Sequence, residues 1–189
     1  APQDIDTVVL SHLHFDHCGG LLTPYSEEKE QELVFPNASF VVGKRHWERC
    51  LQPNPREKAS FLPQLTKLLQ NSSRLTLVDE TSSIHPLIKF SEYDGHTVGM
   101  LLTEFKLESP VLFCADLVPG LAWTSISLSM GFDRSAELSC KEKKEVLEDL
   151  ETRRGYLFYT HDPKHSLARV VRNEKGVITG EPVAFDQVF

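Results

Sequence analysis

The feature that most constrains the fold is a short apolar run that leads directly into a group of metal-binding side chains. Residues 7–10 (Thr-Val-Val-Leu) are β-branched or apolar, which is typical of a buried strand. Four potential ligands follow at once: His12, His14, Asp16 and His17. Imidazole nitrogens and carboxylate oxygens suit zinc and similar divalent ions. The stretch therefore predicts a strand that ends at a metal site, with Gly19-Gly20 as the bend after it.

The spacing of these four residues allows one short loop to serve two neighbouring metals. Alternate residues of an extended segment point the same way, so His12, His14 and Asp16 would share one face. His17 would point elsewhere. A chance group of histidines near a surface turn is the alternative, and the density of ligand-type residues makes it a poor explanation.

Three later segments each place a ligand-type residue after a predicted strand. In Gly95-His96-Thr97-Val98-Gly99 a histidine sits between two glycines in a tight loop, which packing alone explains poorly. Asp116 ends the apolar run 110–115, where a buried carboxylate needs a partner, although a helix-cap or turn role remains an alternative. His161 directly follows the predicted strand 155–160.

These four segments, in this order, resemble the metal-binding motifs of the metallo-beta-lactamase superfamily, and the resemblance covers nearly the whole chain. It implies an α/β (α+β) fold, a four-layer αβ/βα metallo-beta-lactamase-like sandwich, with seven metal ligands. One metal would be held by His12, His14 and His96, the other by Asp16, His17 and His161, and Asp116 would bridge them. One departure is Met100, where the family often has a further histidine that is not a usual ligand.

The resemblance implies a hydrolase. Two ions about 3.5–4 Å apart share a bound water and lower its pKa towards neutrality, so hydroxide forms without a serine or cysteine nucleophile. Asp16 and Asp116 are the expected catalytic residues, because Asp116 would hold both metals and Asp16 could relay a proton. We expect two Zn²⁺ per chain, with Fe or Mn as alternatives, and cleavage of an ester, lactone, thioester or amide in a small-molecule substrate.

The branch of the family that includes lactonases and organophosphate hydrolases is the most similar. Gly131-Phe132-Asp133 and Thr160-His161-Asp162-Pro163 are part of that pattern, and Asp162 is expected to orient His161. An iron-dependent oxidoreductase of the same fold is the first alternative, but its di-iron branch typically has Glu where this chain has His14. A nuclease or a non-catalytic binding member is the second alternative.

Charge and composition bear on these alternatives. The formal net charge is −7, and Lys141-x-Lys143-Lys144 is interrupted by glutamates, which argues against a nucleic-acid surface. A complete ligand set argues against a non-catalytic member. No apolar run reaches transmembrane length, so no membrane association is expected. The four cysteines are widely spaced, which favours reduced thiols and a cytoplasmic protein. Cys18 is expected to pack beside the site rather than to bind metal.

The rest of the chain predicts the scaffold of one domain, residues 1–189. Helices are expected at 44–51, over the apolar spacing at 61–69, and from a capping box at Ser139-x-x-Glu142 to about Arg153. His46 in the first of these helices is expected to pack or face the surface rather than bind metal.

The first motif lies unusually close to the start of the chain. In this superfamily several strands of the N-terminal sheet come before it, whereas here about six residues precede the predicted strand. We therefore expect 1–189 to be the C-terminal larger part of the domain, without its N-terminal strands. The missing segment, or a homodimer partner, would then cover the exposed sheet edge.

Overall fold

A computed structural model describes residues 1–188, which form two compact units. The first unit comprises Ala1–Asp79 together with Gly99–Leu101, and the second comprises Glu80–Val98 and the chain from Leu102 onward. One unit is built on a three-stranded sheet and the other on a six-stranded sheet. The mixed α/β class predicted from the sequence is therefore confirmed.

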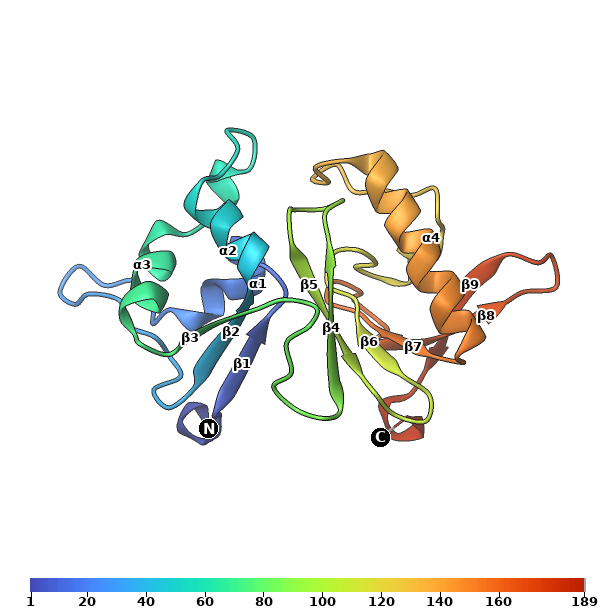
Figure 1. The fold of residues 1–189 in the computed structure, drawn as a ribbon, viewed down its shortest axis with the longest axis horizontal. Helices are drawn as coiled ribbons and strands as arrows, with labels where there is room; N and C mark the ends of the chain where they lie inside the picture. The colour runs from blue at the N-terminus through green and yellow to red at the C-terminus, as the bar shows by residue number, and fades with distance from the viewer. Residues whose placement is uncertain (189) are drawn as a thin grey trace. The chain divides into compact units, whose positions relative to one another are not determined.

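The first unit has a parallel sheet of three strands in sequence order: β1 (Thr7–Leu10), β2 (Ser39–Gly43) and β3 (Leu75–Val78). Parallel neighbours need a crossover, and the link from β2 to β3 contains α2 (Lys44–Leu51) and α3 (Pro63–Asn71) (Figure 1). A single helical turn, α1 (Phe15–Cys18), follows β1. Because parallel strands end at the same edge, the segment after β1 lies beside the start of α2.

The core of the first unit explains this arrangement. Strand β2 is covered on both faces, as is usual for a central parallel strand, because Val41 is 2% exposed and Phe40 and Val42 are fully buried. Phe40 and Val42 share one of these faces. They belong to the same apolar cluster as Trp47 of α2 and Leu65 and Leu69 of α3. The predicted core-facing stripe is confirmed for Leu65 and Leu69, whereas Phe61 and Leu62 precede the helix, which begins at Pro63. This packing gives the segment after Leu10 a rigid support.

The second unit has a six-stranded sheet in the order β4-β5-β6-β7-β8-β9. Its strands are β4 (Ile88–Tyr93), β5 (Met100–Phe105), β6 (Val111–Phe113), β7 (Tyr156–Phe158), β8 (Leu167–Arg172) and β9 (Ile178–Val183). The first two residues of β5 belong to the first unit. β6 and β7 are parallel, whereas β5 pairs with β6, β7 with β8, and β8 with β9 in antiparallel fashion. The crossover between β6 and β7 contains α4 (Ala136–Thr152).

Helix α4 lies against the strands of this sheet (Figure 1). Its buried apolar residues are Val146, Leu147 and Leu150, which lie on one face at helical spacing. The predicted capping box is wrong: the helix begins at Ala136, and Ser135 is the N-cap, whose side chain accepts a hydrogen bond from the Leu138 N–H at 3.4 Å. Glu142 lies inside the helix, and its carboxylate accepts from the N–H groups of Asp94 and Gly95 instead.

Strand β1 forms one edge of its sheet in the part of the chain that the structure describes. The covering segment or second copy expected there stays a prediction. None of the helices within residues 1–188 has the length and apolar composition needed to cross a bilayer.

Candidate metal centre

Three of the predicted ligands of the first unit form a compact histidine cluster after β1. His12 is fully buried and His14 is 8% exposed. The ring of His12 lies 4.6 Å from that of His14 and 4.0 Å from that of His17, centroid to centroid. A ring nitrogen of His12 lies within 4.8 Å of a ring nitrogen of His14 and of His17. A carboxylate oxygen of Asp16 lies within the same distance of a ring nitrogen of His17. The clustering predicted from the motif is therefore present within this unit.

The geometry of the motif differs from the predicted alternation. The chain is extended through His14, which is the N-cap of α1, and then turns into the helix at Phe15. Asp16 therefore does not continue the face of His12 and His14. Its Oδ2 lies 3.5 Å from Nε2 of His17, and its side chain is 43% exposed, whereas that of His17 is 7% exposed. Asp16 is the member of the motif most open to a substrate or to water.

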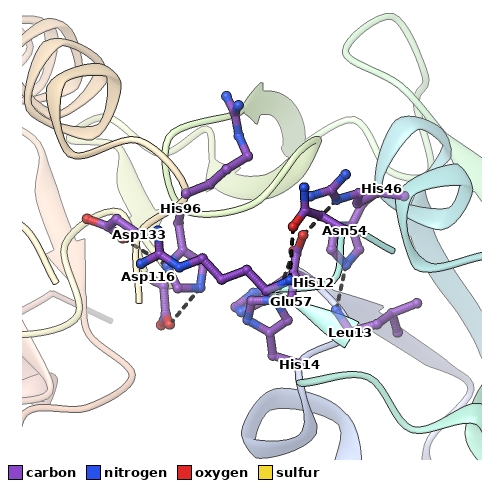
Figure 2. A network of polar contacts seen from close by, with 12 residues as sticks. His12, Leu13, His14, His46, Asn54, Glu57, His96, Asp116 and Asp133 are labelled. Carbon is purple, nitrogen blue, oxygen red and sulfur yellow. Dashed lines mark hydrogen bonds and ion pairs between the residues drawn. The ribbon is translucent and has the colours of Figure 1, made fainter. Parts of the chain in front are cut away.

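The orientation of His14 is fixed by a carboxylate. Nε2 of His14 lies 3.1 Å from Oε1 of Glu57 (Figure 2). Oε2 of Glu57 accepts a 2.6 Å hydrogen bond from Nε of Arg49. A carboxylate paired with a guanidinium only accepts, so Nε2 of His14 carries the proton of that contact. Nδ1 is then the ring nitrogen that His14 can offer to a metal.

His46 supports the same loop from α2. It is fully buried, and its Nε2 accepts a 2.8 Å hydrogen bond from the Leu13 N–H, between the two predicted ligands (Figure 2). An accepting Nε2 carries no proton, so His46 is not protonated on both nitrogens. The expectation of a packing role is correct, but the sequence did not indicate that this residue fixes the backbone between His12 and His14.

Cys18 does not have the character of a ligand. Its thiol is 1% exposed and donates to the carbonyl oxygens of Leu13 and His14 at 3.3 and 3.1 Å. Burial raises the pKa of the Cys18 thiol to about 12, with smaller contributions from Cys50 and Asp16. The thiolate needed for metal binding is therefore disfavoured, in agreement with the predicted packing role.

The second unit brings two of its predicted ligands, His96 and His161, to the third, Asp116. Oδ2 of Asp116 lies 3.3 Å from Nε2 of His96, and Oδ1 lies 3.2 Å from Nε2 of His161. The side chains of His96 and Asp116 are 2% and 7% exposed, whereas that of His161 is 41% exposed. Each carboxylate oxygen thus faces a different imidazole. A carboxylate placed in this way can offer one oxygen to each of two cations.

The backbone on either side of Asp116 is held in a fixed conformation. Ala115, between β6 and Asp116, has a φ of +41°, a left-handed conformation that is unfavourable for a residue with a Cβ. Its carbonyl oxygen accepts a 3.2 Å hydrogen bond from Oγ1 of Thr160, one residue before His161. The His161 N–H donates to the carbonyl oxygen of Pro119 at 2.8 Å. These contacts hold the Asp116 and His161 loops side by side.

Asp162 reinforces the same pair of loops. Its Oδ2 accepts from the Leu121 N–H at 2.8 Å, and its Oδ1 accepts from the N–H groups of Lys164 and His165 at 2.9 and 2.8 Å. These bonds, that from Leu121 first, lower the pKa of the Asp162 carboxyl to about 2. The sequence predicts that Asp162 orients the His161 ring. These contacts give it the different role of ordering the turn that carries His161.

The loop that carries His96 is held by α4. The Glu142 carboxylate accepts hydrogen bonds from the N–H groups of Asp94 and Gly95 at 2.8 and 2.9 Å. Burial raises the pKa of Glu142, and the two N–H bonds partly offset that effect. Gly95 packs so closely on α4 that a Cβ there would lie 2.6 Å from the backbone nitrogen of Ser139. The glycine before His96 is therefore required by close packing.

Three carboxylates hold the predicted ligands or their loops in place, and the sequence did not indicate this role. Glu57, Asp133 and Glu142 are 43, 37 and 47 residues from the groups they bond, so no local pattern joins them to the motifs. Asp133 alone had a signal, since Gly131-Phe132-Asp133 belongs to the resemblance. Such contacts are decided by tertiary packing.

Comparison with known proteins identifies the family of this chain. The model of the metallo-beta-lactamase superfamily matches residues 1–178. An N-acyl homoserine lactonase of a Bacillus species is 25% identical over 168 residues, which cover 85% of this chain and 57% of that protein. The N-acyl homoserine lactonase of Bacillus thuringiensis is 24% identical over the same shares of both proteins. The chain thus spans little more than half the length of the curated relatives it matches.

Solved structures give the same fold. A probable metal-dependent hydrolase from Staphylococcus aureus is 22% identical with a TM-score of 0.82, covering 97% of this chain and 64% of that one. The dizinc quorum-quenching lactonase AidC, in complex with a product, is 23% identical with a TM-score of 0.75, covering 98% of this chain and 66% of that one. The fold predicted from the motifs is confirmed by these likenesses, and with its family model matched over residues 1–178 the chain belongs to the metallo-beta-lactamase superfamily.

Proposed function

We propose that this chain is the metal-binding part of a hydrolase that works with two divalent ions, zinc by preference. The observation that carries the proposal is the Asp116 carboxylate, whose two oxygens face Nε2 of His96 and Nε2 of His161 at 3.3 and 3.2 Å. A buried carboxylate with an imidazole on either side offers oxygen and nitrogen ligands to cations. Bound cations would in turn stabilise the buried negative charge.

The proposed ligand assignment follows the order of the family's motifs. His12, His14 and His96 hold one ion, Asp16, His17 and His161 hold the other, and Asp116 is shared. The clustering of histidine nitrogens in the first unit and the Asp116 contacts in the second support this assignment. We also propose that both units belong to one domain, as a shared site requires.

The chemistry that such a pair of ions supplies when bound is Lewis acidity and a water of lowered pKa. The chain's own residues then have separate tasks. Buried His12 and His96 fix ligand positions in surroundings with little water. Exposed Asp16 provides a carboxylate that can accept a proton from the attacking water at Oδ1 or Oδ2. Ester, lactone, thioester and amide carbonyls are the proposed targets.

Among these targets we place lactones first, because the curated relatives are named N-acyl homoserine lactonases. The substrate is then a small molecule. A cytoplasmic location stays a prediction from the cysteine spacing.

The first test uses the full-length protein purified with zinc and offered lactone, ester, thioester, β-lactam and phosphotriester substrates. We expect lactone turnover that is lost on chelation and restored by added zinc, with two ions per chain by elemental analysis. A folded protein that retains one ion or none after supplementation would contradict the two-metal proposal. Iron content together with oxygen consumption would favour the oxidoreductase alternative.

A second test replaces Asp16 with asparagine. The neutral amide binds a cation weakly and does not accept a proton, so we expect turnover to fall on the order of 100-fold while the fold is retained. Asp6→Asn is the matched control, because Asp6 is an exposed carboxylate just before β1. Equal turnover of the two variants would rule out Asp16 as the proton acceptor.

A further inference from the structure

A buried carboxylate contacts the ring nitrogen of His96 that does not face Asp116. Nδ1 of His96 lies 2.9 Å from Oδ1 of Asp133, and the two side chains are 2% and 4% exposed (Figure 2). Nε2 of the same ring faces Asp116. Each nitrogen of His96 therefore faces a different carboxylate, so the ring lies between Asp116 and Asp133. Both carboxylates belong to the second unit.

The position of Asp133 is built into the backbone. The Arg134 N–H donates to the carbonyl oxygen of His96 at 3.0 Å, and the Ser135 N–H donates to that of Gly95 at 2.9 Å. The segment before α4 thus runs along the His96 loop. The second oxygen of Asp133 accepts from the Met130 N–H at 3.0 Å. Both carboxylate oxygens are therefore engaged, which leaves the side chain little freedom to rotate.

This contact decides which nitrogen of His96 carries the proton. An ionised carboxylate has no hydrogen to donate, so Nδ1 must be the donor. In a neutral imidazole Nε2 then has the lone pair and is the nitrogen available to a cation. A carboxylate partner on the far nitrogen also makes the ligand nitrogen more basic and fixes the ring plane.

We propose that Asp133 is a positioning residue, which holds His96 with Nδ1 protonated and Nε2 directed as a metal ligand. The inference rests on the proposed function, because it takes His96 as a ligand. It adds a residue to the site that the motif order does not assign. Removing such a partner is expected to weaken metal binding by about 10- to 100-fold.

Asp133→Asn is the informative substitution, because asparagine has one oxygen for two donors. If that oxygen accepts from the Met130 N–H, the amide NH₂ faces Nδ1 of His96 and moves the proton to Nε2. If it accepts from His96, the NH₂ opposes the Met130 N–H. The first outcome moves the proton of His96 to the wrong nitrogen, and the second removes the Met130 contact that anchors residue 133. Side-chain volume changes very little in either case.

Glu104→Gln is the matched control. Glu104 is a buried carboxylate of the same unit, 7% exposed, and it pairs with Arg153 through two hydrogen bonds of 3.0 and 2.6 Å. Its substitution disturbs a partly buried ion pair away from the predicted ligands. It therefore reports any loss of affinity that arises from destabilisation alone.

The experiment measures zinc affinity of the full-length protein by competition with a chromophoric chelator, for wild type, Asp133→Asn, Glu104→Gln and His96→Ala. We expect Asp133→Asn to lose about 10- to 100-fold in affinity, and Glu104→Gln to match wild type. If Asp133→Asn binds zinc with wild-type affinity while His96→Ala binds it more weakly, the role of Asp133 is overturned and the ligand assignment stands. Unweakened His96→Ala would instead overturn the ligand assignment on which it rests.

Nitrogen-15 spectra of the zinc-loaded wild type give an independent readout that needs no folded variant. The expected state of His96 is a protonated Nδ1 with Nε2 bearing no hydrogen. A hydrogen on Nε2 of His96 would overturn the inference even if Asp133→Asn failed to fold.

Discussion

Replacing Asp116 with alanine is expected to lower turnover by about a thousandfold or more, because two-metal catalysis depends on both ions being held together. The two oxygens of Asp116 face His96 and His161 at 3.3 and 3.2 Å, so one substitution weakens both proposed metal positions. The measurement is kcat on the best substrate of the panel, together with metal content by elemental analysis.

The control for this variant is Asp149→Ala. Asp149 is a carboxylate on α4 whose side chain is 58% exposed and pairs with Arg153. Turnover and metal content should match wild type, since exposed substitutions away from a site rarely have large effects. An Asp116→Ala protein that retained both ions and wild-type turnover would remove the shared carboxylate from the proposed site.

The largest effect on stability is expected from Gly95→Ala. The added Cβ would lie 2.5 Å from Oγ and 2.6 Å from Cα of Ser139, so backbone atoms of α4 would have to move. Overpacking of this kind costs about 1–3 kcal/mol, occasionally more. At roughly 2–4 °C per kcal/mol for a domain of this size, the midpoint of thermal unfolding should fall by several degrees.

Gly131→Ala is the control for the Gly95 variant. A Cβ at Gly131 would meet nothing within 4 Å, and its φ is not in the left-handed region, so the same chemical change should leave the unfolding midpoint close to that of wild type. Equal midpoints for the two variants would show that the Gly95 loop relaxes away from α4 at little cost. Zinc affinity of Gly95→Ala should also fall, because the loop that carries His96 is displaced.

Much of the fold was open to prediction because it depends on local periodicity. The β-branched run before His12 predicted β1, and the spacing of Leu65 and Leu69 predicted the packed face of α3. Boundaries were less predictable, as the start of α4 shows. Ser135 and Ser139 both precede helix-forming residues, and the structure has Ser135 as the N-cap.

The predicted site residues gather within each unit because they follow strands that end at a common edge or in adjacent loops. The sequence did not predict how they are oriented. It gave no reason to expect the turn into α1 at Phe15, which moves Asp16 off the face of His12 and His14. It also gave Asp162 a role at the His161 ring, whereas its oxygens bond to the N–H groups of Leu121, Lys164 and His165.

The sequence by itself therefore determined the family, the class of fold and the candidate ligands, since ligand chemistry and strand periodicity are written in neighbouring residues. Only the tertiary structure decided which groups fix those ligands. Glu57 on His14 and Asp133 on His96 come from segments tens of residues away. A hydrogen bond depends on distance and direction in space, and chain packing, not residue order, brings a donor and an acceptor within 3 Å or so.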